Sequence, residues 1–490
     1  MEFDGLSDDE IFAKVADAEP AVRVEALMHM GMNRAFEKVD EAIGFYENAY
    51  ELAESNDLRE HRSSACRFLA NALHLAKRNG DAKKVLEVEM AREANLEISD
   101  LAFGNIVGQY AVLLADEGQI EDSITKLEEA SNILKTEEEK MFLPTFFNKV
   151  SQVLINQNKF QLAANIGQRA RSLALETENS EELGMSLYFL GKAYEGMFMF
   201  DDSMKCYKEA FVLLDYRSAG DWELHAKLAM ARLMWFNGDY DASLQELANL
   251  RSVALGAPWA DADLPARCDL QIARNLLAKG DFEGAANKYF QARTLLRAKG
   301  NTIWAAVAEA EGAVAQLVIG NRDEAVQSAE TAMRWWNEES EDYTELWVRL
   351  AYGKVMNATG NHVAALAVLN PDEVFDFNSD FLPHVEYRVE LAEAMGKAGD
   401  PQAAAATAGV VLEFFNHVLT NTDRGRLQNV LAEAAVARNE LPEALRCIAL
   451  SIQSFASDFN TFKVNLLTQR LIEIAAGEAN RANNEVIDGL

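Results

Sequence analysis

The sequence predicts an all-α fold: a right-handed α-solenoid of about eleven helical hairpins with a capping helix at each end. Three observations lead to this prediction. A pattern of small and bulky residues returns about every 40 residues through most of the 490-residue chain. No stretch shows the alternation of apolar and polar residues that marks a half-buried strand. Only 8 prolines are present, so long helices are permitted almost everywhere.

The repeat is marked by the residue that opens the second half of each unit. Successive markers are 43, 38, 40, 40, 40, 42, 40, 40, 39 and 40 residues apart. A phase held over so many units indicates internal repetition across residues 21–457. The marker residues are Ala42, Val85, Ser123, Ala163, Ser203, Ser243, Ala285, Ala325, Ala365, Ala404 and Ala444.

Each unit divides into two helical patterns joined by a turn. The first pattern carries a bulky residue followed by a small one, as in Leu190-Gly191, and the small residue lets a neighbouring helix come close. The turn has a glycine followed by Asp or Asn, as in NGDY at 237–240. Glycine suits the left-handed position after the first helix, and Asp or Asn caps the second. The second pattern spaces a small residue, an aromatic and an alanine, as in SMKCYKEA at 203–210.

These three features together resemble the tetratricopeptide repeat family, and the resemblance covers residues 21–457. The usual period of that family is 34 residues. The longer period here is similar to that of the variants in kinesin light chains and cell-polarity adaptors. The resemblance implies stacked hairpins whose first helices line a concave groove.

The two ends of the chain are predicted to cap the array. Ser7 stands three residues before Glu10, which is the spacing of a capping box at a helix start. The expected organisation is an N-terminal capping helix at 1–20, the solenoid at 21–457 with irregularities at 255–265 and 370–383, a C-terminal capping helix at 458–477, and a polar tail at 478–490.

The composition argues against several classes of protein. With 46 basic and 78 acidic residues the net charge is 46 − 78 = −32, which opposes direct binding to nucleic acid or to anionic membranes. No apolar run reaches the length of a membrane span, and the N-terminus lacks a signal-peptide pattern. The 4 cysteines have neither metal-ligand nor CxxC spacing. We therefore expect a cytoplasmic protein.

Catalytic motifs are also missing from the sequence. There is no phosphate-binding glycine loop, no HExxH and no GxSxG, and the 7 histidines are scattered over different units. The sequence predicts a protein that is not an enzyme and that needs neither a cofactor nor a metal.

In tetratricopeptide arrays the groove residues include the one directly after the small member of the first-helix pair. The resemblance therefore implies a basic row in the groove, and guanidinium and ammonium groups suit a peptide carboxylate. The row is Lys192, Arg232, Arg274 and Lys354. Neighbouring groove residues implied by the same register are Asn148, Gln152, Tyr188, His225, Trp235, Arg267 and Trp347.

An alternative is that these cations pair within the protein, Lys192 with Glu195 and Arg274 with Asp269 or Asp281. The function predicted is a non-enzymatic scaffold or adaptor that binds a peptide or protein segment in the groove. Three alternatives remain open: a peptide-sensing regulator without its own DNA-binding head, an acidic decoy or chaperone for a basic partner, and a self-associating structural subunit of a larger assembly, a virus particle included.

Overall fold

The computed structural model describes residues 3, 6–35, 38–93, 100–197, 199–214, 221–257, 260–337, 344–369, 382–457 and 461–488. Every regular element within these ranges is a helix. The chain divides into two compact units, Met1–Ala226 and Lys227–Leu490. The predicted all-α repeat fold is confirmed, since eleven helical hairpins occur in the described ranges.

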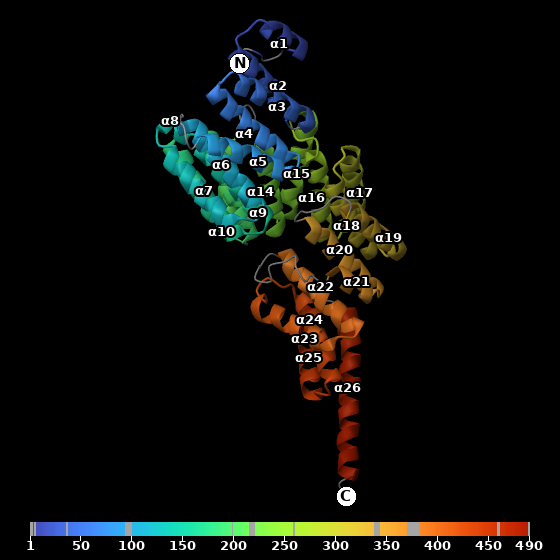
Figure 1. The fold of residues 1–490 in the computed structure, drawn as a ribbon. Helices are drawn as coiled ribbons and strands as arrows, with labels where there is room; N and C mark the ends of the chain where they lie inside the picture. The colour runs from blue at the N-terminus through green and yellow to red at the C-terminus, as the bar shows by residue number, and fades with distance from the viewer. Residues whose placement is uncertain are drawn as a thin grey trace. The chain divides into compact units, whose positions relative to one another are not determined.

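The first unit holds a short N-terminal helix and five hairpins, which Figure 1 shows in blue to green. Its helices are α1 (Asp8–Val15), α2 (Pro20–Met32), α3 (Val39–Ser55), α4 (Arg59–Leu75), α5 (Asn79–Glu93), α6 (Asp100–Asp116), α7 (Ile120–Ile133), α8 (Glu137–Lys140), α9 (Leu143–Asn156), α10 (Phe160–Glu176), α11 (Ser180–Gly196) and α12 (Phe200–Leu213).

The second unit holds six hairpins and a long final helix. The helix α14 (Trp222–Phe236) contains the boundary and contributes residues from 227 onward. The other helices are α15 (Tyr240–Gly256), α16 (Leu264–Ala278), α17 (Phe282–Ala298), α18 (Thr302–Val318), α19 (Arg322–Asn337), α20 (Thr344–Thr359), α21 (His362–Leu369), α22 (Leu382–Ala398), α23 (Pro401–Phe414), α24 (Asn421–Ala437), α25 (Leu441–Ser457) and α26 (Thr461–Asp488).

Within each unit the first helices of several successive hairpins contact one another. In the first unit these contacts join α2 to α4, α4 to α6, α6 to α9 and α9 to α11. In the second unit they join α18 to α20, α20 to α22 and α22 to α24. Each unit therefore contains a layer made of first helices, here called the first-helix layer, in which each hairpin packs on its neighbours as repeat arrays do.

One sequence separation fixes the packing inside a hairpin. In ten hairpins a buried small residue of the first helix stands 12 positions before a buried small residue of the second helix, as Gly191 does before Ser203. The Ser203 hydroxyl donates to the Gly191 carbonyl oxygen at 2.7 Å, and Ser243 donates likewise to Ala231 at 2.7 Å. The ten first-helix residues are Ala70, Ala111, Ser151, Gly191, Ala231, Ala273, Ala313, Gly353, Ala392 and Ala432.

This separation corrects one marker residue. In the hairpin of α4 and α5, the residue 12 positions after Ala70 is Ala82, which is fully buried. Val85, which the repeat pattern put in that place, is only partly buried. Both residues fit a small-or-apolar position, and only the contact with the first helix distinguishes them.

The turn inside the hairpin is equally constant. The residue seven positions after the small first-helix residue has a positive φ in nine hairpins. Six of the nine are glycines, which adopt this left-handed conformation without steric cost. The other three are Lys77 (φ 58°), Asn158 (φ 59°) and Asn439 (φ 62°). The predicted left-handed turn is therefore present, although glycine is not required at every copy.

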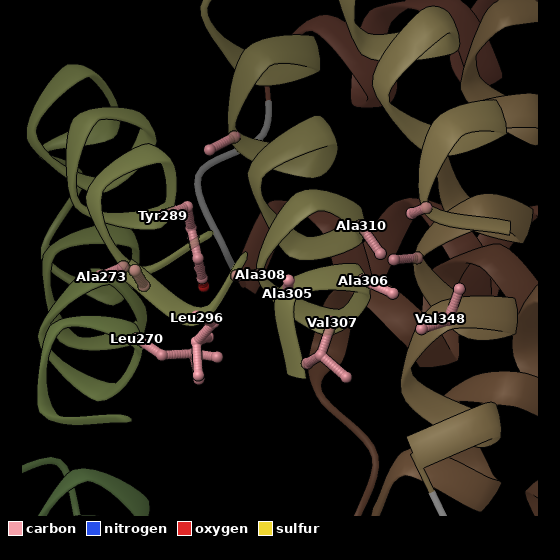
Figure 2. Packing of buried hydrophobic residues seen from close by; sticks show 14 of the residues in the cluster. Leu270, Ala273, Tyr289, Leu296, Ala305, Ala306, Val307, Ala308, Ala310 and Val348 are labelled. Atoms are coloured by element: carbon pink, nitrogen blue, oxygen red, sulfur yellow. The ribbon is translucent and has the colours of Figure 1, made fainter. Parts of the chain in front are cut away.

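The core is built from alanines and a few bulky side chains. Figure 2 shows one such cluster, in which Tyr289 and Leu296 of α17 lie among residues of α16 and α18. The helix α18 contributes a run of alanines that are fully buried, which allows its neighbours to come close. Leu296 is fully buried, and burial of such a side chain stabilises the fold by roughly 2 kcal/mol.

Several end and loop predictions can be compared with the structure. The capping box of Ser7 and Glu10 is present at the start of α1. The second helix α21 is only 8 residues long and ends at Leu369, and most of the segment 370–383 lies outside the described residues. The final helix runs to Asp488, so residues 478–488 continue it. No helix in the described ranges is long and apolar enough to cross a membrane.

Candidate functional site

The first-helix layer is where the predicted groove residues lie. An ion pair between α16 and α18 illustrates how side chains reach from one first helix to the next. Arg274 directly follows Ala273, and its partner Glu311 precedes Ala313 by two. Such pairs are therefore separated by slightly less than one period of the repeat.

Arg274 is neutralised inside the second unit. Its Nε donates to Glu311 Oε2 at 2.9 Å, its Nη2 lies 2.5 Å from Glu311 Oε1, and its Cζ lies 4.8 Å from the centre of the Trp347 ring. The expected partner Asp269 is instead held by Arg251 and Lys288. Arg274 therefore pairs within the protein, as one alternative proposed, but with a carboxylate of the next first helix.

Lys354 and its neighbours form a larger ion-pair network. Lys354 Nζ donates to Glu386 Oε2 at 2.8 Å. Arg426 on α24 donates to both oxygens of the buried Glu390, at 2.8 Å each, and also to Glu393 at 2.8 Å. The Arg426 guanidinium holds the pKa of Glu390 below its usual range against the effect of burial. A cavity of about 170 Å³ beside this network is lined in part by Glu393 and Arg426.

The remaining residues of the predicted site divide between the two units. In the first unit Tyr188 is buried and packs against Phe189, Tyr207 and Trp222, so it belongs to the core. In the second unit the rings of Trp235 and Phe236 lie 4.8 Å apart. Lys192 Nζ lies 6.0 Å from the centre of the Tyr188 ring, and Arg267 Cζ lies 5.5 Å from the centre of the Trp304 ring. His225 Nε2 lies 3.3 Å from Asp221 Oδ2. Arg232 and Gln152 are partly buried.

The first unit contains two cations of a different kind, Arg67 on α4 and Lys149 on α9. Both are partly buried, and among the described residues no carboxylate oxygen lies within 4.0 Å of either. Lys149 Nζ donates to Asn71 Oδ1 at 3.2 Å. The Arg67 Cζ lies 4.4 Å from the centre of the Phe68 ring. Burial and the nearby Arg67 charge lower the pKa of Lys149 to about 8.

A carboxylate does lie near this pair, but it is engaged elsewhere. Glu182 on α11 raises the pKa of Lys149 by its charge, yet its own oxygens accept from Thr145 and Asn148. The two bonds measure 2.5 Å and 2.7 Å. Among the described residues Lys149 therefore has no ion pair within 4.0 Å, and the Glu182 charge acts on it from a greater distance.

Two amide atoms of the same layer have no hydrogen-bond partner among the described residues. Gln109 on α6 is 1% exposed, and its Nε2 has no hydrogen-bond partner. Asn148 is 3% exposed, and its Oδ1 is likewise unpaired. Because an unsatisfied buried polar group costs about 1–3 kcal/mol, such groups call for an explanation, and a bound ligand is one.

Sequence reasoning did not single out Arg67 and Lys149 because it followed a different offset. It traced the residue directly after the small first-helix residue, whereas Arg67 and Lys149 precede it by three and by two. The marker at Val85 also shifted the register of the α4–α5 hairpin by three residues. The sequence carries no clear signal for them, because ion pairs between first helices span 32 to 37 residues and acids also stand 33 residues after Arg67 and Lys149.

No protein-family model matches the sequence, and no curated protein matches it. Solved structures with a similar arrangement of helices include a Rap protein in complex with the competence and sporulation factor, which is 14% identical with a TM-score of 0.44 over 85% of this chain and 99% of that one. The apo quorum sensor NprR from B. thuringiensis is 13% identical with a TM-score of 0.47 over 74% and 99%. The human IFIT1 dimer with m7Gppp-AAAA is 14% identical with a TM-score of 0.48 over 84% and 90%.

Proposed function

We propose that this protein is a non-enzymatic scaffold that binds a segment of another protein on the first-helix layer of its first unit. The observation that carries the proposal is a contrast between particular cations of the two layers. In the second unit Arg274, Lys354 and Arg426 each face a carboxylate at hydrogen-bond distance. In the first unit Arg67 and Lys149 do not.

The donors and acceptors of the first unit suit a peptide backbone. Gln109 offers an unpaired amide N–H and Asn148 an unpaired amide oxygen, both on buried side chains. An extended segment presents carbonyl and N–H groups in alternation, so it satisfies both kinds of group at once. Helical repeat arrays bind extended partners along the surface that consecutive repeats create.

A peptide-selection experiment tests this function. A displayed library of random peptides is panned on the full-length protein, and the affinities of the selected peptides are measured by calorimetry. Peptides that carry a photo-crosslinker are expected to attach to α4, α6 and α9. Crosslinks confined to the second unit, or no enrichment of peptides over rounds, would refute the proposal.

Matched variants locate the site. Arg67→Gln with Lys149→Gln is expected to weaken binding of the selected peptides at least tenfold. The control carries Lys84→Gln and Lys208→Gln, which remove the same charge from two exposed positions on second helices of the same unit. Its affinity is expected to equal that of the wild type.

A further inference from the structure

The proposed scaffold leaves open what chemical group of the partner enters the site. We infer that Arg67 and Lys149 bind a phosphoryl group, with Gln109 as an additional donor. This inference rests on the proposed function when the group belongs to a phosphorylated segment, and stands without it when the ligand is free phosphate.

The charges around Lys149 favour an anionic ligand. Arg67 and Lys149 lie close enough for the Arg67 charge to affect Lys149, and neither has an ion pair among the described residues. Among the described residues Glu182 is the carboxylate whose charge acts on Lys149, and it keeps that charge because its side-chain donors, Thr145 and Asn148, are neutral. Arg67, Lys149 and Glu182 together therefore keep a net positive charge, which a bound anion compensates. A phosphate monoester carries −1.5 to −2 near pH 7, whereas a carboxylate carries −1.

The N–H groups of Arg67, Lys149 and Gln109 favour a ligand with several oxygen atoms. The Arg67 guanidinium has five N–H groups, and its one described contact is with the Phe68 ring. Lys149 uses one of its three N–H groups on Asn71. Gln109 Nε2 has no partner and is buried. Donors therefore outnumber acceptors here, which is the composition that three phosphoryl oxygens require.

The positions of these residues in the fold agree with a single site. The three donors come from α4, α6 and α9, which contact one another in sequence. Gln109 and Lys149 stand at the same place relative to their small first-helix residues, 40 positions apart. The Lys149–Asn71 hydrogen bond joins α9 directly to α4, the helix that carries Arg67, and α6 contacts both helices. The other ionisable group described beside Arg67 is the buried Tyr46 hydroxyl, which remains neutral because burial raises its pKa to about 12.

The test uses the full-length protein and three probes: inorganic phosphate, an array of serine-containing peptides, and the same array with phosphoserine. The wild type is expected to bind selected phosphoserine peptides at least tenfold more tightly than their serine forms. The variant with Arg67→Gln and Lys149→Gln is expected to lose this preference, and the Lys84→Gln, Lys208→Gln control to keep it. Folding of each variant is checked by circular dichroism.

Proton uptake gives a readout that a structural role does not produce. Phosphate next to Lys149 raises the pKa of that ammonium, so binding at pH 8.5 is expected to take up protons. Calorimetry in two buffers of different ionisation enthalpy measures this uptake, and Lys149→Gln is expected to abolish it. Equal uptake in the wild type and the variant would overturn the assignment of Lys149.

The outcomes separate the two proposals. Phosphoserine-dependent peptide binding that requires both cations supports both. Binding of inorganic phosphate alone, lost in the double variant, supports the phosphoryl site and overturns the peptide scaffold. Serine peptides that bind the wild type and the double variant equally well leave a peptide-binding scaffold, but they overturn the phosphoryl site and the assignment of Arg67 and Lys149 to peptide binding. Absence of binding to any of the three probes overturns both.

Discussion

Replacement of Lys149 by glutamine is expected to make the protein more stable at neutral pH. The pKa of this ammonium falls from 10.5 to about 8, a difference of about 2.5 units, because burial and the Arg67 charge disfavour its protonated form. At about 1.4 kcal/mol per unit this corresponds to about 3 kcal/mol. The variant loses the hydrogen bond to Asn71, which contributes about 1 kcal/mol. The net gain expected is about 2 kcal/mol.

The sign of the pH dependence follows from the same shift. Below pH 8 Lys149 is protonated in the folded and the unfolded chain, so its destabilising effect is complete. Between pH 8 and 10.5 the unfolded chain binds more protons, and stability rises with pH. The difference between the variant and the wild type is therefore expected to shrink from pH 7 to pH 10.

Thermal unfolding followed by circular dichroism measures both effects. For a cooperative unit of about 200 residues, 1 kcal/mol shifts the midpoint by about 2–4 °C, so a rise of about 4–8 °C is expected at pH 7. Lys84→Gln, at an exposed position, is the control and is expected to change the midpoint by less than about 1 °C. A variant that is less stable than the wild type at pH 7, or a difference that grows toward pH 10, would refute the reasoning.

Four further predictions concern the fold. Lys77→Gly removes a non-glycine residue from a left-handed turn and is expected to stabilise the protein by about 1 kcal/mol in thermal unfolding. Gly191→Ala puts a methyl group about 2.7 Å from the buried Tyr207 ring and is expected to lower the free energy of unfolding by about 2 kcal/mol in thermal unfolding. Gly44→Ala, where an added methyl group meets nothing within 4 Å, is the control and is expected to raise that free energy by about 0.5–1 kcal/mol. Glu390→Gln leaves its guanidinium partner undercompensated and is expected to cost about 3 kcal/mol at pH 7; because the pKa of Glu390 is lowered, this difference is expected to diminish as the pH falls below 4.5. Burial raises the pKa of Cys268 to about 12, so mass spectrometry is expected to find it unalkylated at pH 8 until urea is added.

The hairpins could be predicted because their packing is local. A small residue in each of two helices, 12 positions apart, is visible in the sequence, and the turn between them has a recognisable glycine. The register at Ala82 was missed because valine also fits the pattern three residues later, and burial alone distinguishes them. Periodicity within a helix does not show this difference.

The charge pairs could not be predicted because they join different hairpins. Arg274 was assigned to acids within seven residues of it, but its partner Glu311 is 37 residues away on the next first helix. That distance is about one period less one helical turn, so it depends on how far neighbouring hairpins are displaced along each other. For the same reason the lack of ion pairs at Arg67 and Lys149 among the described residues becomes visible only when the layer is assembled.

The constant separation of 12 residues has a consequence for how such a chain can change in length. Residues added or lost inside a hairpin move one small residue out of line with its partner and open a gap between the two helices. The separation between successive hairpins, by contrast, already varies between 39 and 42 residues. Insertions are therefore tolerated only in the connections between hairpins. A whole hairpin, bounded by equivalent connections, is the natural unit for duplication, deletion or exchange.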